Sequence, residues 1–199
     1  MNKIYAVSIL GLSLLSAGCG TSENNSGTTG SLSLNITDAP IDSANSVVVQ
    51  FNAVQIRGTE ANQNIDFNFD TPKSIDLLLL QGSESESLFT NETVPAGTYD
   101  EVRLIVDAED GTQDSFIVLT EGGQQHDLSV PSGSQSGLKI KGSFVVPANG
   151  SASFTADFDV RKSIVKSGNP DNPKYHLKPV IRIVDNAEVG HIQGTVDTA

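Results

Sequence analysis

The sequence predicts an all-β protein, a single antiparallel β-sandwich, and two observations carry this prediction. Apolar and polar residues alternate with a period of two along most of the chain from Ser31 onward, which is typical of strands with one buried face. Turn signals such as Asp110-Gly111 and Asn149-Gly150 separate these short segments at regular intervals. A chain of 199 residues with 37% hydrophobic residues favours one domain with its own core.

The strand segments differ in how clearly they alternate. The clearest are residues 32–37, 65–70, 154–161 and 175–183. Within 47–56 the apolar parity changes by one residue, which predicts a bulge near Ala53. Pro179 interrupts the last segment and predicts an edge strand or a bulge there. The run Ile75–Leu80 leaves two alternatives open, a turn of helix or a buried strand.

Two hairpins are predicted in register from the parity of their apolar residues. The inward residues of 138–146 and 154–160 are all even-numbered, which favours a three-residue loop, Ala148-Asn149-Gly150, with Gly150 in the left-handed conformation. The same test favours a Gly122-Gly123-Gln124 loop between 116–118 and 128–130. The first register places these residues opposite one another: Phe144 and Phe154, Ile140 and Phe158, Lys141 and Asp157, Lys139 and Asp159.

The N-terminus has the features of an export signal. Lys3 is followed by an apolar run from Ile4 to Leu15, which is shorter than the roughly 20 residues needed to span a bilayer. The segment Leu15-Ser16-Ala17-Gly18-Cys19 resembles a bacterial lipobox, with Ser16 where Leu is usual. Residues 1–18 are therefore predicted to be a lipoprotein signal peptide and Cys19 to be the lipidated residue. An ordinary soluble export signal is the alternative.

Lipidation at Cys19 has further implications for the exported chain. Gly20, rather than Asp, follows the cysteine, and by resemblance to Gram-negative sorting rules this favours the outer membrane, at its periplasmic face or the cell surface. The polar stretch up to Gly30 is predicted to be a flexible tether. This gives a domain plan of 1–18 signal peptide, 19–30 lipidated Cys and tether, and 31–199 β-sandwich.

Composition excludes several function classes. The chain has 24 Asp and Glu against 12 Lys and Arg, a net charge of −12, which argues against nucleic acid as a partner. One cysteine cannot form an internal disulfide. The three histidines, His126, His176 and His191, are scattered, and no Gly-x-Ser-x-Gly motif is present. We therefore expect no enzymatic activity and no zinc site.

Calcium is the one metal that the sequence leaves open, because it prefers carboxylate oxygens from loops. No other cofactor is expected. A polar turn or a surface charge ladder explains the same carboxylates. For sugar binding, Tyr99 and Tyr175 are the remaining aromatic candidates. The candidate calcium ligands are Asp38, Asp42, Asp107, Asp110, Asp157 and Asp159.

Several segments together resemble a known family. They are SLSLNITDAP (31–40), PKSIDLL (72–78), VPAGTYDEVRL (94–104), VPSGSQSGLKI (130–140), FDVRKSIV (158–165) and YHLKPVIRIVD (175–185). Their order and spacing resemble the bacterial lipoprotein family of the domain of unknown function 4382, from about Gly30 to about Thr195. The resemblance implies an exported, lipid-anchored protein with a β-sandwich body, and it implies no functional residues. We expect the sandwich to be of immunoglobulin or transthyretin-like type.

The end of the chain carries a second resemblance. Residues 190–196 are similar to the first strand of a carboxypeptidase-regulatory-like or transthyretin-like repeat. This segment is expected to be a last strand of the sandwich or a remnant of a second domain.

These observations lead to one expected function and two alternatives. We expect an outer-membrane-anchored lipoprotein, held in the membrane through Cys19, that acts as a non-enzymatic binding, adhesion or structural module for a protein or glycan partner. A calcium-dependent module that binds carbohydrate-type ligands is the first alternative. An unrecognised hydrolase is the second.

Overall fold

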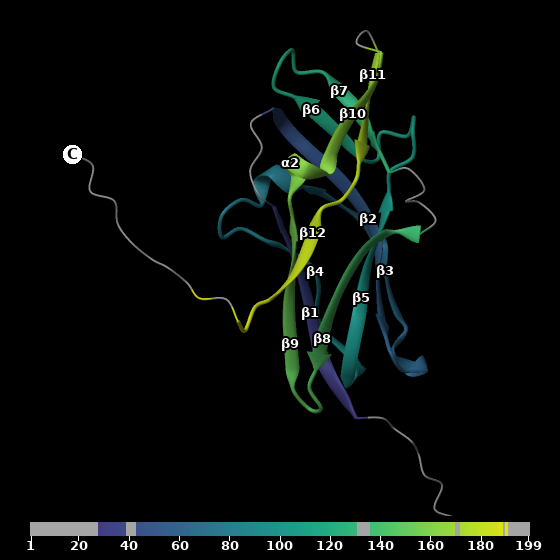
Figure 1. Cartoon of the computed structure of the whole chain (residues 1–199), viewed down its shortest axis with the longest axis vertical. Helices are drawn as coiled ribbons and strands as arrows, with labels where there is room; N and C mark the ends of the chain where they lie inside the picture. Colours follow the sequence, from purple (N-terminus) through teal and green to yellow (C-terminus); the bar gives the residue numbers. More distant parts are fainter. Residues whose placement is uncertain (1–27, 39–42, 131–135, 170–171, 189, 191–199) are drawn as a thin grey trace, which may run out of the picture.

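The chain folds into two β-sheets that share one core (Figure 1). The computed structural model describes residues 28–38, 43–130, 136–169, 172–188 and 190. The smaller sheet has the strand order β12-β9-β1-β4, and the larger has the order β10-β11-β7-β6-β2-β5-β8, with β3 paired to β2 outside this path. The predicted all-β sandwich with a single domain is confirmed.

The strands range in length from 4 residues in β6 to 15 residues in β2. The strands are β1 (Thr29–Asp38), β2 (Ala44–Gly58), β3 (Ile65–Asp76), β4 (Glu86–Pro95), β5 (Gly97–Asp107), β6 (Phe116–Leu119), β7 (Gln125–Ser129), β8 (Leu138–Val146), β9 (Ser151–Phe158), β10 (Ile164–Asn169), β11 (Asn172–Leu177) and β12 (Ile181–Asp185). The helical turns are η1 (Ala61–Gln63), η2 (Leu77–Leu79) and α2 (Val160–Ser163). Of the run Ile75–Leu80, Ile75 and Asp76 end strand β3 and Leu77–Leu79 form the η2 turn, so each of the two alternatives holds for part of the run.

The long strand β2 organises the larger sheet. One of its edges pairs with β3, whereas the other pairs first with β6 and then with β5. Both the β3 and the β5 ladders shift register between Phe51 and Ala53, so the predicted bulge is confirmed. Because a bulge bends and twists its strand, β2 joins the end of the sheet that holds β6 and β7 to the end that holds β5 and β8 (Figure 1).

Most ladders are antiparallel, and two are not. β1 pairs with β9 in parallel over eight residue positions, and β11 pairs with β7 in parallel. Parallel neighbours need a long connection between them. Here β2–β8 lie between β1 and β9 in the sequence, and β8–β10 lie between β7 and β11. These two pairs were not part of the sequence prediction.

The core contains the alternating residues that the sequence singled out. Leu32, Leu34 and Ile36 are almost inaccessible, and so are Ala156 and Phe158 on the neighbouring strand. Ile65, Phe67 and Phe69 are half-buried and pack against this core. The period-two pattern therefore predicted the buried face correctly.

The predicted hairpin between β8 and β9 is wrong, although its inward residues are right. β8 pairs with β5, while β9 pairs with β1 and β12 in the other sheet. Phe144 and Phe154 do meet, with ring centroids 4.7 Å apart, but across the core. The parity of the residue numbers cannot distinguish these arrangements. Inward residues can all be even-numbered when their strands pair in one sheet, and equally when the strands face each other across the core. Asn149, not Gly150, adopts the positive φ in the connection.

The lysine ladder that the hairpin implied is therefore absent. Lys141 lies opposite Glu101, and Lys139 lies opposite Arg103, both on β5. Asp157 and Asp159 have other partners near α2, described below.

The β6–β7 turn is also longer than predicted. Leu119 N donates to Gln124 O at 3.0 Å, which leaves four residues, 120–123, in the turn rather than three. Ile117 is the buried residue of β6, and it pairs with His126. The apolar residues Phe116 and Val118 on the opposite face misled the parity test.

Pro179 lies between two strands rather than within one. β11 belongs to the larger sheet and β12 is the edge strand of the smaller sheet, so the chain changes sheets at this proline. Among the described residues, no helix is long and apolar enough to cross a membrane. Apart from Gly190, the segment 190–196 lies outside the described residues.

A tyrosine holds the corner where the chain passes from β4 to β5. Tyr99 is fully buried, and its hydroxyl donates to Pro95 O at 2.7 Å. This geometry resembles the tyrosine corner of immunoglobulin-type sandwiches. Gln63 fills the space beside the corner, because a Cβ on Gly97 would lie 2.1 Å from Gln63 Nε2. The corner fixes one crossing between the two sheets.

Replacing Tyr99 by Phe tests this corner. The change removes the donor to the buried Pro95 carbonyl, so we expect a loss of about 1 kcal/mol in the free energy of unfolding. Tyr175→Phe is the matched control, because its hydroxyl makes no hydrogen bond with the described residues. Chemical denaturation measures both, and equal stability of the two variants would contradict the prediction.

Candidate functional site

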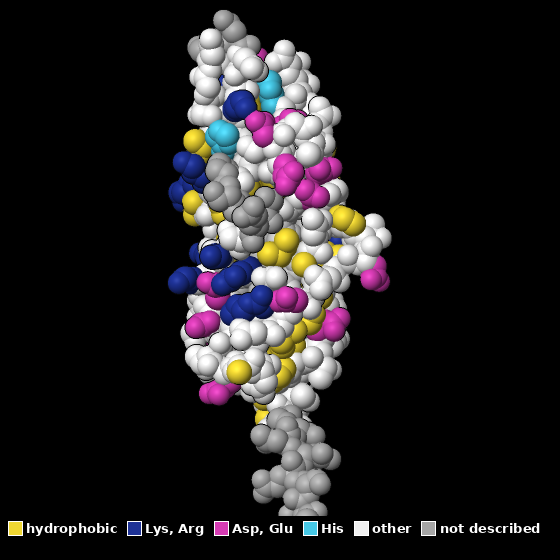
Figure 2. Space-filling view, turned by 90° about the vertical axis from the view of Figure 1, so that its right-hand side faces the viewer, with side chains coloured by type: hydrophobic (Ala, Val, Ile, Leu, Met, Phe, Trp, Pro, Cys, Tyr) yellow, Lys and Arg dark blue, Asp and Glu magenta, His cyan; other side chains and the backbone are white. Residues whose placement is uncertain are grey.

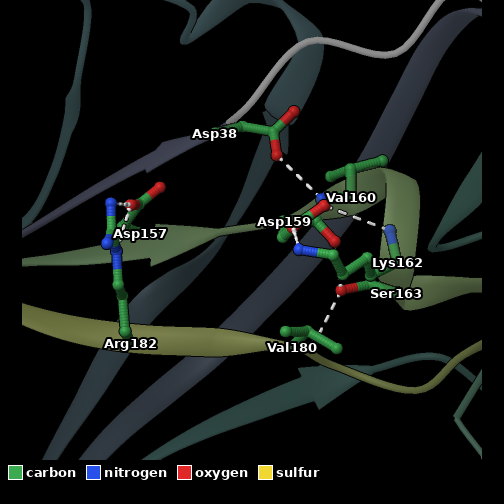
Figure 3. A network of polar contacts seen from close by, with 8 residues as sticks. All are labelled: Asp38, Asp157, Asp159, Val160, Lys162, Ser163, Val180 and Arg182. Carbon is green, nitrogen blue, oxygen red and sulfur yellow. Dashed lines mark hydrogen bonds and ion pairs between the residues drawn. The ribbon is translucent and has the colours of Figure 1, made fainter.

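Three segments that are distant in the sequence meet around α2 (Figure 3). Asp38 comes from the end of β1, Asp159 and Ser163 come from α2 and its N-cap, and Val180 follows the Pro179 crossing. These residues belong to the segments 31–40, 158–165 and 175–185 that the sequence analysis singled out. The three segments are therefore in contact with one another in the folded protein, although they are distant in the sequence.

Asp38 ties β1 to the start of α2. Its side chain is 5% exposed, and its Oδ1 accepts from Val160 N at 3.0 Å. Asp159 caps the same turn, because its Oδ1 accepts from Lys162 N at 3.2 Å. Capping by Asp satisfies backbone donors that a helix start leaves free, so both carboxylates act on the backbone of α2.

Ser163 links α2 to the Pro179 crossing. Its hydroxyl is fully buried, donates to Asp159 O at 2.7 Å and accepts from Val180 N at 2.8 Å. Backbone bonds reinforce the link, because Asp159 N donates to Val180 O and Lys178 N donates to Ser163 O. The crossing between the two sheets is thus held by one buried serine and its neighbours.

The charges around this network pair at the surface. Arg182 Nη2 lies 2.6 Å from Asp157 Oδ2, and Lys162 Nζ lies 2.6 Å from Asp159 Oδ2 (Figure 3). The hydrogen bond from Lys162 holds the pKa of the Asp159 carboxyl below its usual value. The Lys162–Asp159 pair therefore favours the ionised carboxylate of Asp159.

The candidate calcium ligands are spread over the structure. Asp107 Oδ2 lies 3.5 Å from Asn52 Nδ2, and Asp110 Oδ2 lies 2.5 Å from Lys174 Nζ. The Lys174 ammonium lowers the pKa of Asp110. No group of three or more acidic, His or Cys side chains that could hold a metal occurs among the described residues. Asp42 and Cys19 lie outside the described residues, and calcium binding stays a prediction.

A serine–histidine contact was missed by the sequence analysis. His176 Nε2 lies 2.7 Å from Ser167 Oγ, and His176 Nδ1 lies 2.8 Å from Ser129 Oγ. These residues come from three strands, so no local motif signals them. A hydrolase triad would place a carboxylate on the second ring nitrogen, and here a serine occupies that position.

The other histidines and tyrosines are placed differently. His126 packs against the Tyr175 ring with centroids 4.9 Å apart, and His191 lies outside the described residues. Tyr99 is inside the core, whereas Tyr175 lines a hollow next to α2.

Three open hollows border α2. The largest, here called the upper hollow, has a volume of about 740 Å³ and includes Arg161, Ile164 and Tyr175 in its lining. A second, of about 580 Å³, carries Lys139, Lys162 and Lys178. The third, of about 380 Å³, lies over the Asp157–Arg182 pair. Although the chain is strongly acidic, Lys and Arg side chains gather across the middle of one face (Figure 2).

Comparison with known proteins identifies the family. A family model described as "Domain of unknown function (DUF4382)" matches residues 29–179. The chain belongs to this family. The match begins where β1 begins and ends at the Pro179 crossing, so it includes Asp38 and all of α2. No curated protein matches the chain, and no solved structure does.

Replacing Ser163 by Ala tests the link at the crossing. The change leaves Val180 N without its buried acceptor, so we expect a loss of about 1–3 kcal/mol in the free energy of unfolding. Arg182→Gln is the control, because its side chain is 77% exposed and such pairs contribute within about 1 kcal/mol. If Ser163→Ala were no more destabilising than Arg182→Gln, the crossing would depend on other contacts.

The Asp159 carboxyl gives a pH-dependent prediction. Its lowered pKa means that the folded state gains stability above the ordinary aspartate pKa and loses it as the pH falls through the lowered value. We expect Lys162→Gln to raise the pKa of Asp159 toward its usual value, as measured by NMR titration of the side-chain carboxyl. An unchanged titration would show that the cap bond from the backbone is sufficient.

Proposed function

We propose that this protein is an exported lipoprotein, anchored in the outer membrane through Cys19, whose β-sandwich is a non-enzymatic binding module. The single observation that supports this most is the position of the N-terminal strand at one end of the sandwich. β1 starts at one end of the sandwich, and β6, β7, β10 and β11 lie at the other (Figure 1). A membrane anchor before β1 leaves the far end facing away from the bilayer.

The segment between the anchor and the fold sets the distance from the membrane. Ten residues join Cys19 to Gly30, and an extended chain spans at most about 3.3–3.6 Å per residue. The first strand begins at Thr29, so the sandwich stands within about 35 Å of the lipid surface. This reach separates the body from the headgroups and leaves its hollows accessible.

The upper hollow supports binding as the activity. Its volume of about 740 Å³ falls within the range of small-molecule sites, roughly 300–1,000 Å³. Its wall is mostly apolar, with a few charged groups at the rim, which is also typical of such sites. Among the described residues, in contrast, the His176 ring nitrogens contact Ser129 and Ser167 rather than a carboxylate.

Replacing Cys19 by Ser tests the anchor. Without the thiol no acyl chain is attached, and we expect the variant to lose incorporation of labelled palmitate and to leave the membrane fraction. Palmitate labelling and fractionation of cells measure these two properties. A variant that stays in the membrane fraction would contradict the anchor at Cys19.

Gly20→Asp is the matched change for the sorting step. It keeps Cys19 and its acyl chains, and we expect the labelled protein to move from the outer to the inner membrane. Separation of the two membranes on a density gradient gives the result. An unchanged distribution would leave lipidation intact as a proposal and remove the outer-membrane assignment.

A further inference from the structure

The upper hollow lies at the end of the larger sheet that the smaller sheet does not cover (Figure 1). Its lining comes from β6, β10 and β11, from α2, and from the turn after β6. These strands form the end of the molecule that extends beyond the smaller sheet (Figure 1). The lining of the upper hollow includes Leu119, Glu121, Arg161, Ile164, Lys166 and Tyr175.

The floor of the upper hollow continues the core. Ile164 pairs with Leu177 and Lys166 pairs with Tyr175, so these four side chains lie on one face of the sheet. Tyr175 also pairs with the buried Leu128, and Ile117 pairs with the buried Val47. The hollow is therefore bounded by the same apolar face that the smaller sheet covers elsewhere.

The rim of the upper hollow is positively charged. Arg161 and Lys166 border it, and neither forms an ion pair with any of the described residues. One carboxylate, Glu121, lies on the same rim, which leaves a net positive charge in a chain whose own net charge is −12. Lys166 Nζ lies 6.0 Å from the centre of the Tyr175 ring. A cation over an apolar floor suits a ligand with an anionic head and an apolar body.

The exposure of Tyr175 decides between an aliphatic ligand and a sugar. A sugar uses an exposed aromatic ring as its stacking surface, but Tyr175 is only 5% exposed. The walls that remain are the aliphatic side chains of Leu119 and Ile164, both half-buried. These walls accommodate a methylene chain better than a sugar ring.

We propose that the upper hollow binds a fatty acid, with its chain on Leu119 and Ile164 and its carboxylate held by Arg161 and Lys166. This assignment deepens the proposed binding function by naming its ligand class. It does not depend on lipidation of Cys19, because the hollow is formed by the sandwich alone. Charge-assisted hydrogen bonds at the rim give the preference for an acid, and the apolar wall gives the preference for a chain.

Binding of three probes that share the same alkyl chain and differ in their head groups tests the proposal. Residues 20–199 include every described strand and lack Cys19, so the fold is tested without acyl chains. We expect decanoate to bind more tightly than decanol, and decyltrimethylammonium not to bind, in calorimetric titrations below micelle formation. The amide shifts caused by decanoate in NMR spectra should map to residues 161–166 and 117–121.

Two double variants separate the upper hollow from its neighbour. Arg161→Gln with Lys166→Gln should weaken decanoate binding by about ten-fold while decanol binding stays the same. Lys139→Gln with Lys178→Gln removes the same charge from the second hollow and should leave both ligands unaffected. Leu119→Asn should weaken decanoate and decanol alike. Far-ultraviolet circular dichroism and thermal melts confirm that each variant is folded.

Three results would overturn the fatty-acid proposal. The first is no binding of decanoate by the folded chain. The second is an equal loss of decanoate binding in the two double variants, which would assign the effect to the overall charge of the protein. The third is binding of glucuronate without decanoate, which would assign the hollow to an acidic sugar. None of these results bears on palmitate labelling of Cys19, so failure of the ligand and failure of the anchor remain distinguishable.

Discussion

The hydrogen bonds of Ser163 hold the place where the two sheets are joined late in the chain. The serine hydroxyl is fully buried and contacts both Asp159 O and Val180 N. Beyond it, the chain leaves β11 in the larger sheet and enters β12 at the edge of the smaller sheet. Without this link, the edge strand β12 would depend on its ladder with β9 and on the side-chain contacts along that ladder, such as the Arg182–Asp157 pair.

The same link positions the groups around the upper hollow. Because Asp38 and Asp159 fix the start of α2, Arg161 is held at the rim of the hollow on one side. Lys162, the next residue, is directed to the Asp159 carboxylate and to the second hollow. The four-residue turn α2 thus places two successive basic residues, Arg161 and Lys162, at the edges of neighbouring hollows. Asp159 at the start of this turn serves the fold, and Arg161, which forms no ion pair with the described residues, is available to a ligand.

The unequal size of the two sheets is the second constraint on function. A sheet must cover its apolar face with another layer, and the smaller sheet covers only part of the larger one. At the end formed by β6, β10 and β11, a hollow takes the place of that layer. The fold and the proposed ligand are therefore connected by one physical requirement, the burial of apolar surface.

The sequence by itself determined the core face of most strands, because a period of two is a local property of a strand, but it selected the wrong face of β6. It also determined the bulge near Ala53 and the membership of the family. It marked Pro179 as an interruption, but not as the place where the chain changes sheets. Only the tertiary structure decided which strands pair. Even-numbered residues such as Phe144 and Phe154 satisfy a hairpin and a contact across the core equally well. The sites followed the same rule: Asp38, Ser163 and Val180 are brought together by packing, and Arg161 and Lys166 border one hollow because two sheets of different size share a core.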